Sequence, residues 1–282
     1  MTLADLDEKR RLVLLEVVER YYDAVPRSSA RAEDFAALTL FVRDGAGLPF
    51  YARPTLGWNG AVRAADVTRV RDRQRELGIP EAFEWVAETT PALREAVEAS
   101  GLTVHEHPLM VLDDGAEVRP LDDRPAGVSV RILGPDDPAL PSALALPYLA
   151  FGEPGTGIGS AGPAELAAAV RERAEDGAVR SRRDRMRAGL TVVGAAVRDG
   201  MALCSGQHQP VGAVSEIVGV GTLPSERRRG LARAVTAALV ADARSRGVQT
   251  VFLSAGDDDV ARMYSRVGFR RIATALIAEP AG

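Results

Sequence analysis

The sequence contains very little cysteine and histidine. Cys204 is the only cysteine, and there are three histidines among 282 residues. A single cysteine excludes an internal disulfide framework and any zinc site built from several cysteines. Three histidines leave little material for a metal centre, so the sequence predicts no metal site.

Long apolar runs are also missing. No apolar run approaches the roughly 20 residues that span a bilayer. Residues 1–11 are charged where a secretory signal peptide is apolar. These absences predict a cytoplasmic protein with no membrane partner. Lys9 is the only lysine, so nearly all basic residues are arginine, which is typical of a GC-rich genome.

The overall composition is that of a globular protein. Hydrophobic residues make up 46% and charged residues 26% of the chain, which excludes disorder for most of it. The length allows one large domain or two modest ones. A formal net charge of −4 gives no general attraction to nucleic acid, so no nucleic-acid partner is expected, although a local basic patch remains open.

The first part of the chain predicts short helices and strands that end in a polar segment. Apolar spacing and breakers favour helices over 10–25, 31–43, 64–77 and 90–101, and strands over 48–52, 83–87 and 109–112. Residues 113–127 are rich in Asp, Gly and Pro, which is typical of a boundary. We therefore expect an N-terminal domain over 1–120, a linker over 121–127 and a second domain over 128–282.

The second part alternates strands and helices more clearly. Strands are expected over 128–133, 191–197, 201–205, 214–223, 248–254 and 272–278, and helices over 138–149, 163–174, 229–246 and 260–266. This alternation predicts an α/β or α+β fold in which a mixed central sheet is flanked by helices. The strand–helix–strand order of 83–112 parallels that of 251–278, so a degenerate duplication and an unrelated first domain both stay open.

A strand, a turn and the start of a helix follow one another in residues 215–232. Arg227, Arg228, Arg229 and Gly230 stand where the helix opens. The first N–H groups of a helix lack internal partners and carry positive partial charge, and glycine lets a ligand approach the backbone. Such a turn can hold a pyrophosphate. Taken alone, however, the arginines also fit a solvated basic turn.

Two motifs in this region resemble the GNAT superfamily of acyl-CoA-dependent N-acyltransferases. Arg227, Gly230 and Ala232 match the family's acyl-CoA signature, which is Arg or Gln, two residues, Gly, one residue, then Gly or Ala. Tyr264 followed by Gly268-Phe269 resembles the later family motif. The resemblance covers about 128–282 and is strongest over 214–270.

The resemblance implies acetyl-CoA as co-substrate and predicts its binding residues. The pantetheine arm would pair with the backbone of Val220, Gly221 and Thr222 in a gap between two splayed strands. The pyrophosphate would lie on the N–H groups of a continuous segment, which comprises Arg227, Arg228, Arg229, Gly230, Leu231, Ala232 and Arg233. Asp257 is a further candidate for a cofactor contact, but many family members have Asn there, which leaves that contact in doubt.

The same resemblance predicts two catalytic groups. Glu216 stands where a strand carboxylate serves as general base in one branch of the family; the alternative is an outward-facing structural carboxylate. Tyr264 would donate a proton to the leaving thiolate, and the alternative is a core aromatic residue. A backbone N–H near Val220 would stabilise the oxyanion.

Three weaker patterns carry less information. Residues 157–162 match GxGxxG by letter but lack the preceding strand of a dinucleotide site, so we expect a loop that flanks the acceptor pocket. The basic run Arg182, Arg183, Arg185 and Arg187 fits a solvated edge; an anionic acceptor or the 3′-phosphate of CoA is the alternative. His208, at the end of a hairpin strand near the predicted site, is expected to be a polar loop residue; a second base is the alternative.

The sequence as a whole predicts a tandem protein whose second domain is active. That domain is expected to transfer an acetyl group from acetyl-CoA to a primary amine, of a small molecule or of a protein, by direct attack. The N-terminal domain would be GNAT-like in outline and without a cofactor site. A non-catalytic acyl-CoA-binding regulator is the alternative, and a homodimer is compatible with either.

Overall fold

The computed structural model describes residues 3–45, 47, 49–113, 115, 116, 118, 125–174 and 177–281. The chain divides into two compact units. Unit 1 comprises Met1–Leu109 and Arg271–Gly282, and unit 2 comprises Met110–Arg270. The expected division at 1–120 and 128–282 therefore missed the return of the C-terminal segment to unit 1. Most of the expected linker, residues 121–124, lies outside the described part of the chain.

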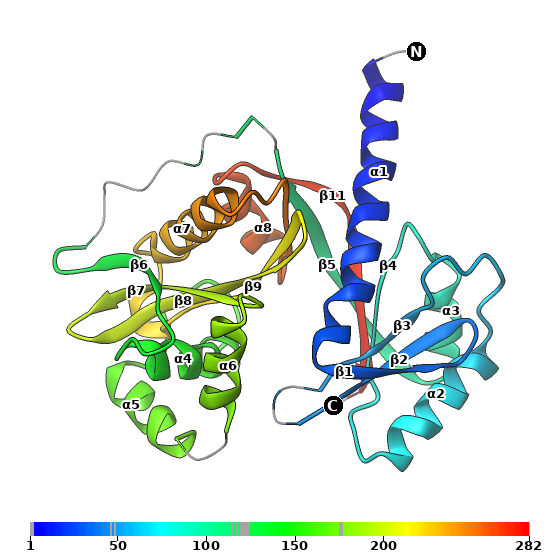
Figure 1. The fold of residues 1–282 in the computed structure, drawn as a ribbon, viewed down its shortest axis with the longest axis horizontal. Coiled ribbons are helices and arrows are strands. Elements are labelled where there is room, and N and C mark those ends of the chain that lie inside the picture. Colours follow the sequence, from blue (N-terminus) through cyan, green and yellow to red (C-terminus); the bar gives the residue numbers. More distant parts are fainter. Residues whose placement is uncertain are drawn as a thin grey trace. The chain divides into compact units, whose positions relative to one another are not determined.

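Unit 1 contains three α-helices and a mixed sheet among its described residues (Figure 1). The elements are α1 (Leu3–Ala24), η1 (Pro26–Ser28), β1 (Ala30–Asp34), β2 (Leu38–Arg43), β3 (Ala52–Pro54), α2 (Ala64–Glu76), β4 (Phe83–Val86), α3 (Leu93–Ala99), the first part of β5 (Leu102–Leu112) and most of β11 (Phe269–Pro280). The strand order is β1-β2-β3-β4-β11-β5. Because β11 pairs antiparallel with β4, the last residues of the chain complete this sheet.

The helix expected over 31–43 is wrong, since this segment is the antiparallel hairpin β1–β2. Asp34 accepts a hydrogen bond from the N–H of Ala36 at 2.7 Å, and Ala36 has a φ of 63°. An Asx turn of this kind reverses the chain and stops a helix from continuing. Every residue of Leu38–Val42 is buried, so this run is a strand with two covered faces and has no helical period.

Unit 2 holds the remaining strands of the sheet, to which β5 contributes its last residues. Its elements are β6 (Ser129–Leu133), α4 (Leu140–Gly152), α5 (Pro163–Glu172), α6 (Ala178–Arg187), β7 (Val192–Arg198), β8 (Met201–Val211), β9 (Val214–Thr222), η2 (Pro224–Glu226), α7 (Leu231–Ser245), β10 (Thr250–Ser254) and α8 (Asp258–Ser265). The strand order is β5-β10-β9-β8-β7-β6. Only the β9–β10 pair is recorded as parallel among the described pairings of β6 to β10.

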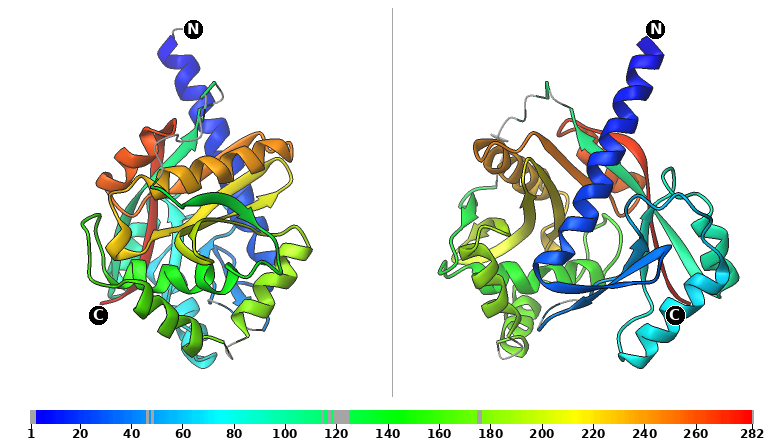
Figure 2. Two further views of the ribbon diagram at one scale, coloured as in Figure 1. Left: turned by 90° about the vertical axis from the view of Figure 1, so that its left-hand side faces the viewer. Right: turned by 45° about the vertical axis from the view of Figure 1, so that its right-hand side comes forward.

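Helices cover both faces of the unit 2 sheet (Figures 1 and 2). Helix α7 packs on one face through Val235, Leu239 and Val240, and α4 packs on the other through Leu140 and Leu146. Burial of such large aliphatic side chains contributes about 1.5–3 kcal/mol each. These two layers hold β8 and β9 in place between them.

Glycine residues in the strands let these helices approach the sheet closely. A Cβ on Gly194 or Gly206 would lie 3.0 or 3.2 Å from the Leu239 side chain of α7. A Cβ on Gly221 would lie 2.8 Å from the Cβ of Ala150 in α4. The predicted cofactor residue Gly221 therefore also has a packing role, because any side chain there would push α4 away from β9.

Helix α6 was not expected from the sequence. It begins at Ala178 and contains five arginines, and none of its residues is buried. An apolar stripe, the usual signal of a helix, is therefore lacking. Hydrogen bonds hold it together with the partly buried Met186: Arg183 Nε donates to the carbonyl of Pro135 at 2.9 Å and Arg185 Nε to Thr191 Oγ1 at 3.4 Å.

The expected fold class is confirmed, because each unit has a mixed sheet flanked by helices. Both units also contain a parallel strand–helix–strand segment, which is β3–α2–β4 in unit 1 and β9–α7–β10 in unit 2. Within the described ranges, no helix has the length and apolar character needed to cross a membrane. A cytoplasmic location stays a prediction.

Candidate functional site

The parallel strands β9 and β10 pair only at their beginnings. Three residue pairs are formed, the last two being Ser215 with Val251 and Glu216 with Phe252. Beyond Glu216 no further pairing with β10 is found in this described region, although β9 continues to Thr222. The backbone of Val220, Gly221 and Thr222 therefore runs along a strand that has left its parallel neighbour, as the sequence predicted.

A β-bulge accompanies this separation. Ser205 pairs with Gly221 and Gln207 with Val218, so Gly206 alone faces two residues of β9, Gly219 and Val220. Gly219 adopts a φ of 63°, which favours glycine. A bulge bends its strand and shifts which side chains face each side of the sheet. The bend carries the end of β9 toward the turn that precedes α7.

The turn before α7 leaves the helix N-terminus open to an anion. Arg228 and Gly230 have φ values of 66° and 72°, and Gly230 is the N-cap. No side chain caps α7, and no acidic residue lies in its first turn. Its first N–H groups therefore keep their hydrogen-bonding capacity and their positive partial charge for a bound ligand.

The four arginines of this turn divide into two pairs. Arg227 donates to the carbonyls of Ala150 at 2.8 Å and Glu153 at 2.6 Å, at the end of α4. Arg229 lies 3.0 Å from the buried carboxylate of Glu226. Among the residues that the structure describes, Arg228 and Arg233 make no ion pair. These two guanidinium groups are the ones available to bind phosphate oxygens.

The loop between α4 and α5 is fixed against this turn. Glu153 accepts hydrogen bonds from the N–H groups of Ser160 at 3.0 Å and Ala161 at 2.8 Å. These bonds hold the pKa of Glu153 below its ordinary value. Gly159 donates its N–H to the carbonyl of Pro224 at 3.0 Å. The segment 157–162 therefore joins two helices, as expected, and is no dinucleotide loop.

Glu216 lies on the face of β9 that points away from α7. Its cross-strand partner is Gln209, and Val218 lies opposite Gln207, so these four side chains share one face. Glu216 is half-buried at the last residue pair before β9 and β10 separate. A carboxylate in this position can accept a proton at the start of the gap, which stays a prediction.

Tyr264 lies on α8 inside the unit 2 core. It is 6% exposed, and its ring packs edge-to-face on Phe269 with centroids 5.9 Å apart. Burial, together with the neighbouring Cys204, raises the pKa of the Tyr264 hydroxyl above its ordinary value. The phenol therefore keeps its proton at neutral pH, as a general acid must. This packing is compatible with both predicted roles of Tyr264, general acid and core aromatic residue.

Asp257 begins helix α8. Its Oδ1 accepts a hydrogen bond from the N–H of Val260 at 2.8 Å, which is a helix N-cap. The carboxylate is thus committed to the helix start. A direct bond from this side chain to the cofactor, which the sequence left in doubt, would have to compete with the cap.

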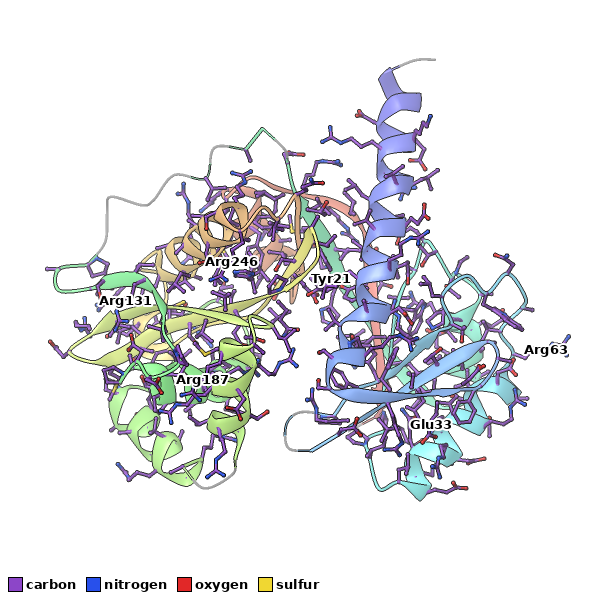
Figure 3. All side chains as sticks on the ribbon, viewed as in Figure 1. Tyr21, Glu33, Arg63, Arg131, Arg187 and Arg246 are labelled. Atoms are coloured by element: carbon purple, nitrogen blue, oxygen red, sulfur yellow. The ribbon has the colours of Figure 1, made fainter. Side chains whose placement is uncertain are left out.

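The expectation that His208 is a polar loop residue is wrong. His208 is fully buried on β8, on the α7 side of the sheet. Its Nδ1 lies 2.9 Å from Ser215 Oγ, and its Nε2 lies 2.9 Å from Asp242 Oδ2 on α7. Asp242 is also paired with Arg246, which Figure 3 labels. The two glutamines beside His208 made the segment look like a polar loop. They lie on the opposite face of the strand, so their polarity says nothing about the burial of His208.

The His208 network should make the protein less stable in mild acid. Burial lowers the pKa of His208, although the Asp242 carboxylate acts in the opposite direction. Unfolded His208 takes up a proton below about pH 6.5, whereas the folded form resists it. The unfolding free energy should therefore fall as pH drops through 6.5 toward the lower pKa of the folded state.

His208→Gln tests this pH dependence. The variant keeps a hydrogen-bonding side chain that does not titrate, and we expect it to lose about 2 kcal/mol at pH 7.5. In urea melts at several pH values, its deficit relative to the wild type should shrink as pH falls below about 6.5. A deficit that stays constant with pH would contradict the role given to His208.

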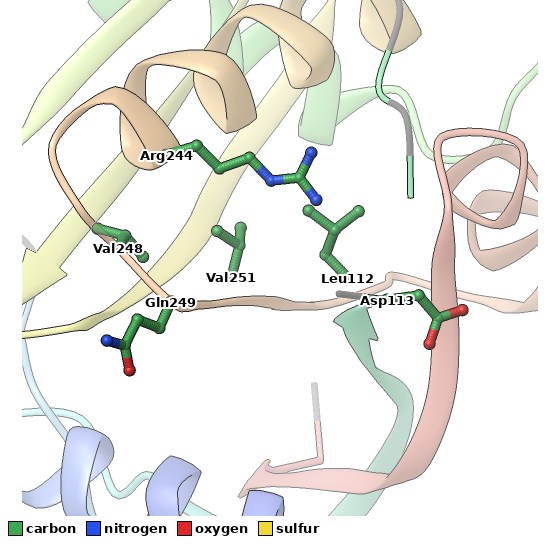
Figure 4. A pocket seen from close by; sticks show the side chains of 6 residues that line it. All are labelled: Leu112, Asp113, Arg244, Val248, Gln249 and Val251. Atoms are coloured by element: carbon green, nitrogen blue, oxygen red, sulfur yellow. The ribbon is translucent and has the colours of Figure 1, made fainter. Parts of the chain in front are cut away.

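A separate cavity of about 220 Å³ lies where β10 begins (Figure 4). Its lining consists of Leu112, Asp113, Arg244, Val248, Gln249 and Val251. Its two charged side chains already have partners, since Arg270 donates to Asp113 at 2.6 Å and Arg244 donates to the carbonyl of Ala116 at 2.9 Å. No predicted site residue lines this cavity.

Comparison with known proteins identifies the architecture. Residues 192–277 match the family model described as FR47-like protein, a GNAT-related domain. Among solved structures, a GCN5-related N-acetyltransferase from Kribbella flavida is 22% identical with a TM-score of 0.68, over 95% of this chain and 96% of that one. The chain has the GNAT fold. The predicted resemblance to this superfamily is thereby confirmed.

Other structures with the GNAT fold also match most of the chain. A GCN5-related N-acetyltransferase-like protein from Streptococcus suis is 14% identical with a TM-score of 0.56, over 97% of this chain and 98% of its own. A tandem GNAT protein from the clavulanic acid biosynthesis pathway is 16% identical with a TM-score of 0.51, over 87% and 79%. No curated protein matches this chain significantly.

Proposed function

We propose that unit 2 is an N-acetyltransferase that takes its acetyl group from acetyl-CoA and gives it to a primary amine. The open N-terminus of α7, preceded by left-handed Arg228 and Gly230, is the observation that carries this proposal. A helix start of this kind suits the pyrophosphate of a nucleotide cofactor. The GNAT fold supports a transferase of this class.

The residues present fit acetyl-CoA. The β9 backbone from Val220 to Thr222, which pairs with β8 and has no recorded partner on its β10 side, would hold the pantetheine arm, and the N–H groups from Arg227 to Arg233 would hold the pyrophosphate. Arg228 and Arg233 supply free positive charge beside it. When bound, acetyl-CoA supplies an activated thioester carbonyl.

The corresponding helix of unit 1 lacks these properties. Helix α2 follows β3 as α7 follows β9, but Asp66 lies in its first turn. The Asp66 carboxylate accepts the N–H of Arg63 at 2.9 Å, so the start of the helix is already capped by a negative charge. We therefore propose that unit 1 binds no acetyl-CoA and that each chain binds one equivalent.

The predicted catalytic groups would move protons in opposite directions. Glu216 would take a proton from the acceptor ammonium, directly or through water, as the amine nitrogen bonds to the thioester carbon. A backbone N–H near Val220 would stabilise the oxyanion. Tyr264 would then protonate the sulfur as the carbon–sulfur bond breaks, and the second proton lost by the nitrogen would return to Tyr264 through solvent. The Tyr264 hydroxyl, whose pKa is raised by burial, is protonated and ready for this step.

The pyrophosphate position is tested with Gly230→Asp and Gly230→Asn. Both side chains tolerate a left-handed N-cap better than most, and they differ by one negative charge. Calorimetry should show one acetyl-CoA per wild-type chain and a Kd at least about tenfold higher for the Asp than for the Asn variant. An acidic N-cap stabilises a helix, so unfolding would not produce this difference.

Two results would count against the proposal. Equal acetyl-CoA affinity in the two folded Gly230 variants would show that no phosphate lies at the start of α7. Tight acetyl-CoA binding by the wild type without release of free thiol, across a broad panel of amines, would indicate the non-catalytic regulator instead.

A further inference from the structure

The face of the sheet that carries Glu216 is apolar under α4 but polar around Glu216 itself. Gln207 and Gln209 of β8 lie on it beside Glu216, whereas the opposite face is closed by the α7 core and the His208 network. A polar acceptor molecule would approach Glu216 from this face. The other side chains on this face therefore influence which acceptor can bind.

Helix α6 brings a guanidinium group to this face. Its Met186 packs on the same core cluster as α4, which places α6 on the α4 side of the sheet. Arg182 Nη1 donates a hydrogen bond to Gln207 Oε1 at 2.5 Å. Gln207 lies opposite Val218, two residues along β9 from Glu216. The residue pairs Gln207–Val218 and Gln209–Glu216 are therefore about 7 Å apart along the strands.

The other arginines of α6 hold the helix or point to solvent. Arg183 and Arg185 bond to Pro135 and Thr191, and Arg187 pairs with Asp136 at 2.9 Å. Arg180 is exposed and makes no ion pair among the described residues. Arg182 is therefore the α6 arginine that is half-buried and directed at the side chains around Glu216.

We propose that the acceptor amine carries a carboxylate or phosphate group and that Arg182 binds this oxyanion while Glu216 takes the proton of the ammonium. This inference rests on the proposed function of unit 2. A guanidinium forms strong, often bidentate, hydrogen bonds with such oxyanions. The Gln207 side chain orients Arg182 for this contact, and Glu216 repels the same oxyanion, so a charged acceptor can bind in one orientation only.

Matched pairs of amines test the proposal. Each pair has an anionic and a neutral member: γ-aminobutyrate with butylamine, lysine with cadaverine, and phosphoethanolamine with ethanolamine. Release of free thiol from acetyl-CoA gives kcat/KM for each. We expect the wild type to prefer the anionic member of at least one pair by about tenfold or more. The carboxylate and phosphate pairs show which oxyanion is recognised.

Three variants assign the preference to Arg182. Arg182→Gln should abolish it while changing kcat/KM for the neutral amine by less than about twofold, and Arg182→Lys should retain part of it. Arg180→Gln, on the same helix, should behave as the wild type. Melting temperatures and calorimetric acetyl-CoA affinity should be unchanged in all three.

Each contrary result has a distinct meaning. Equal activity on anionic and neutral amines, or equal selectivity in the Arg182→Gln and Arg180→Gln variants, overturns this inference and leaves the proposed function standing. Weaker acetyl-CoA binding by Arg182→Gln overturns it as well, because Arg182 would then contact the cofactor. No thiol release with any of the amines overturns this inference and the acetyl transfer together.

Discussion

Glu216→Gln is expected to lower kcat at neutral pH by about 10²–10⁴-fold, the usual contribution of a general base. The substitution keeps the size and hydrogen-bonding capacity of a side chain that lies half-buried where β9 leaves β10. It removes only the ability to accept a proton. Activity should recover partly as the pH rises, because the amine then loses its proton to solvent.

The pH–rate profile distinguishes this role from a structural one. Acetyl-CoA affinity should stay close to that of the wild type, since Glu216 lies on the face of β9 that points away from α7. Arg180→Gln, at an exposed position of α6, serves as a control and should leave the shape of the profile unchanged. A Glu216→Gln profile that matches the wild type at every pH would assign this carboxylate to structure.

Tyr264→Phe is expected to reduce kcat by about 10–10³-fold, at the low end of acid–base effects because CoA thiol is a good leaving group. The ring keeps its edge-to-face contact with Phe269, so stability should change by less than about 1 kcal/mol. The proton is needed chiefly in the transition state, and acetyl-CoA affinity should therefore change much less than the rate.

Stability measurements separate the two readings of Tyr264. Tyr264→Leu removes the buried ring and should cost several kcal/mol, whereas Tyr264→Phe should not. Equal losses of affinity and of kcat/KM in Tyr264→Phe would mean that the hydroxyl only holds the cofactor. Turnover at the wild-type rate would remove Tyr264 from the mechanism and leave water as the proton donor.

Some elements could be predicted from the sequence of the residues that form them. Arg227, Gly230 and Ala232 predicted the turn before α7, and the structure forms that turn with Gly230 in a left-handed conformation. Chain connectivity alone makes these residues neighbours. For the same reason α2, α7 and α8 were expected close to their observed bounds.

The tertiary structure was needed to show which arginines of this turn bond to other residues of the protein. Nothing in the sequence distinguishes Arg227 and Arg229 from Arg228 and Arg233. The fold brings the end of α4 and the carboxylate of Glu226 against the first two, and leaves the other two without ion pairs in the described region. The engagement of Arg227 therefore depends on a segment about 75 residues away, whereas Arg229 pairs with Glu226 only three residues before it.

The sequence by itself determined the fold class, the turn before α7 and, apart from α6, the order of strands and helices in unit 2, because periodicity and turn chemistry act between near neighbours. Only the tertiary structure decided that β11 completes the sheet of unit 1, that His208 is buried between Ser215 and Asp242, and that Arg182 shares a face with Glu216. Those relations depend on strand register and on helix packing between distant segments, and a change of register by one residue would reverse every side chain involved.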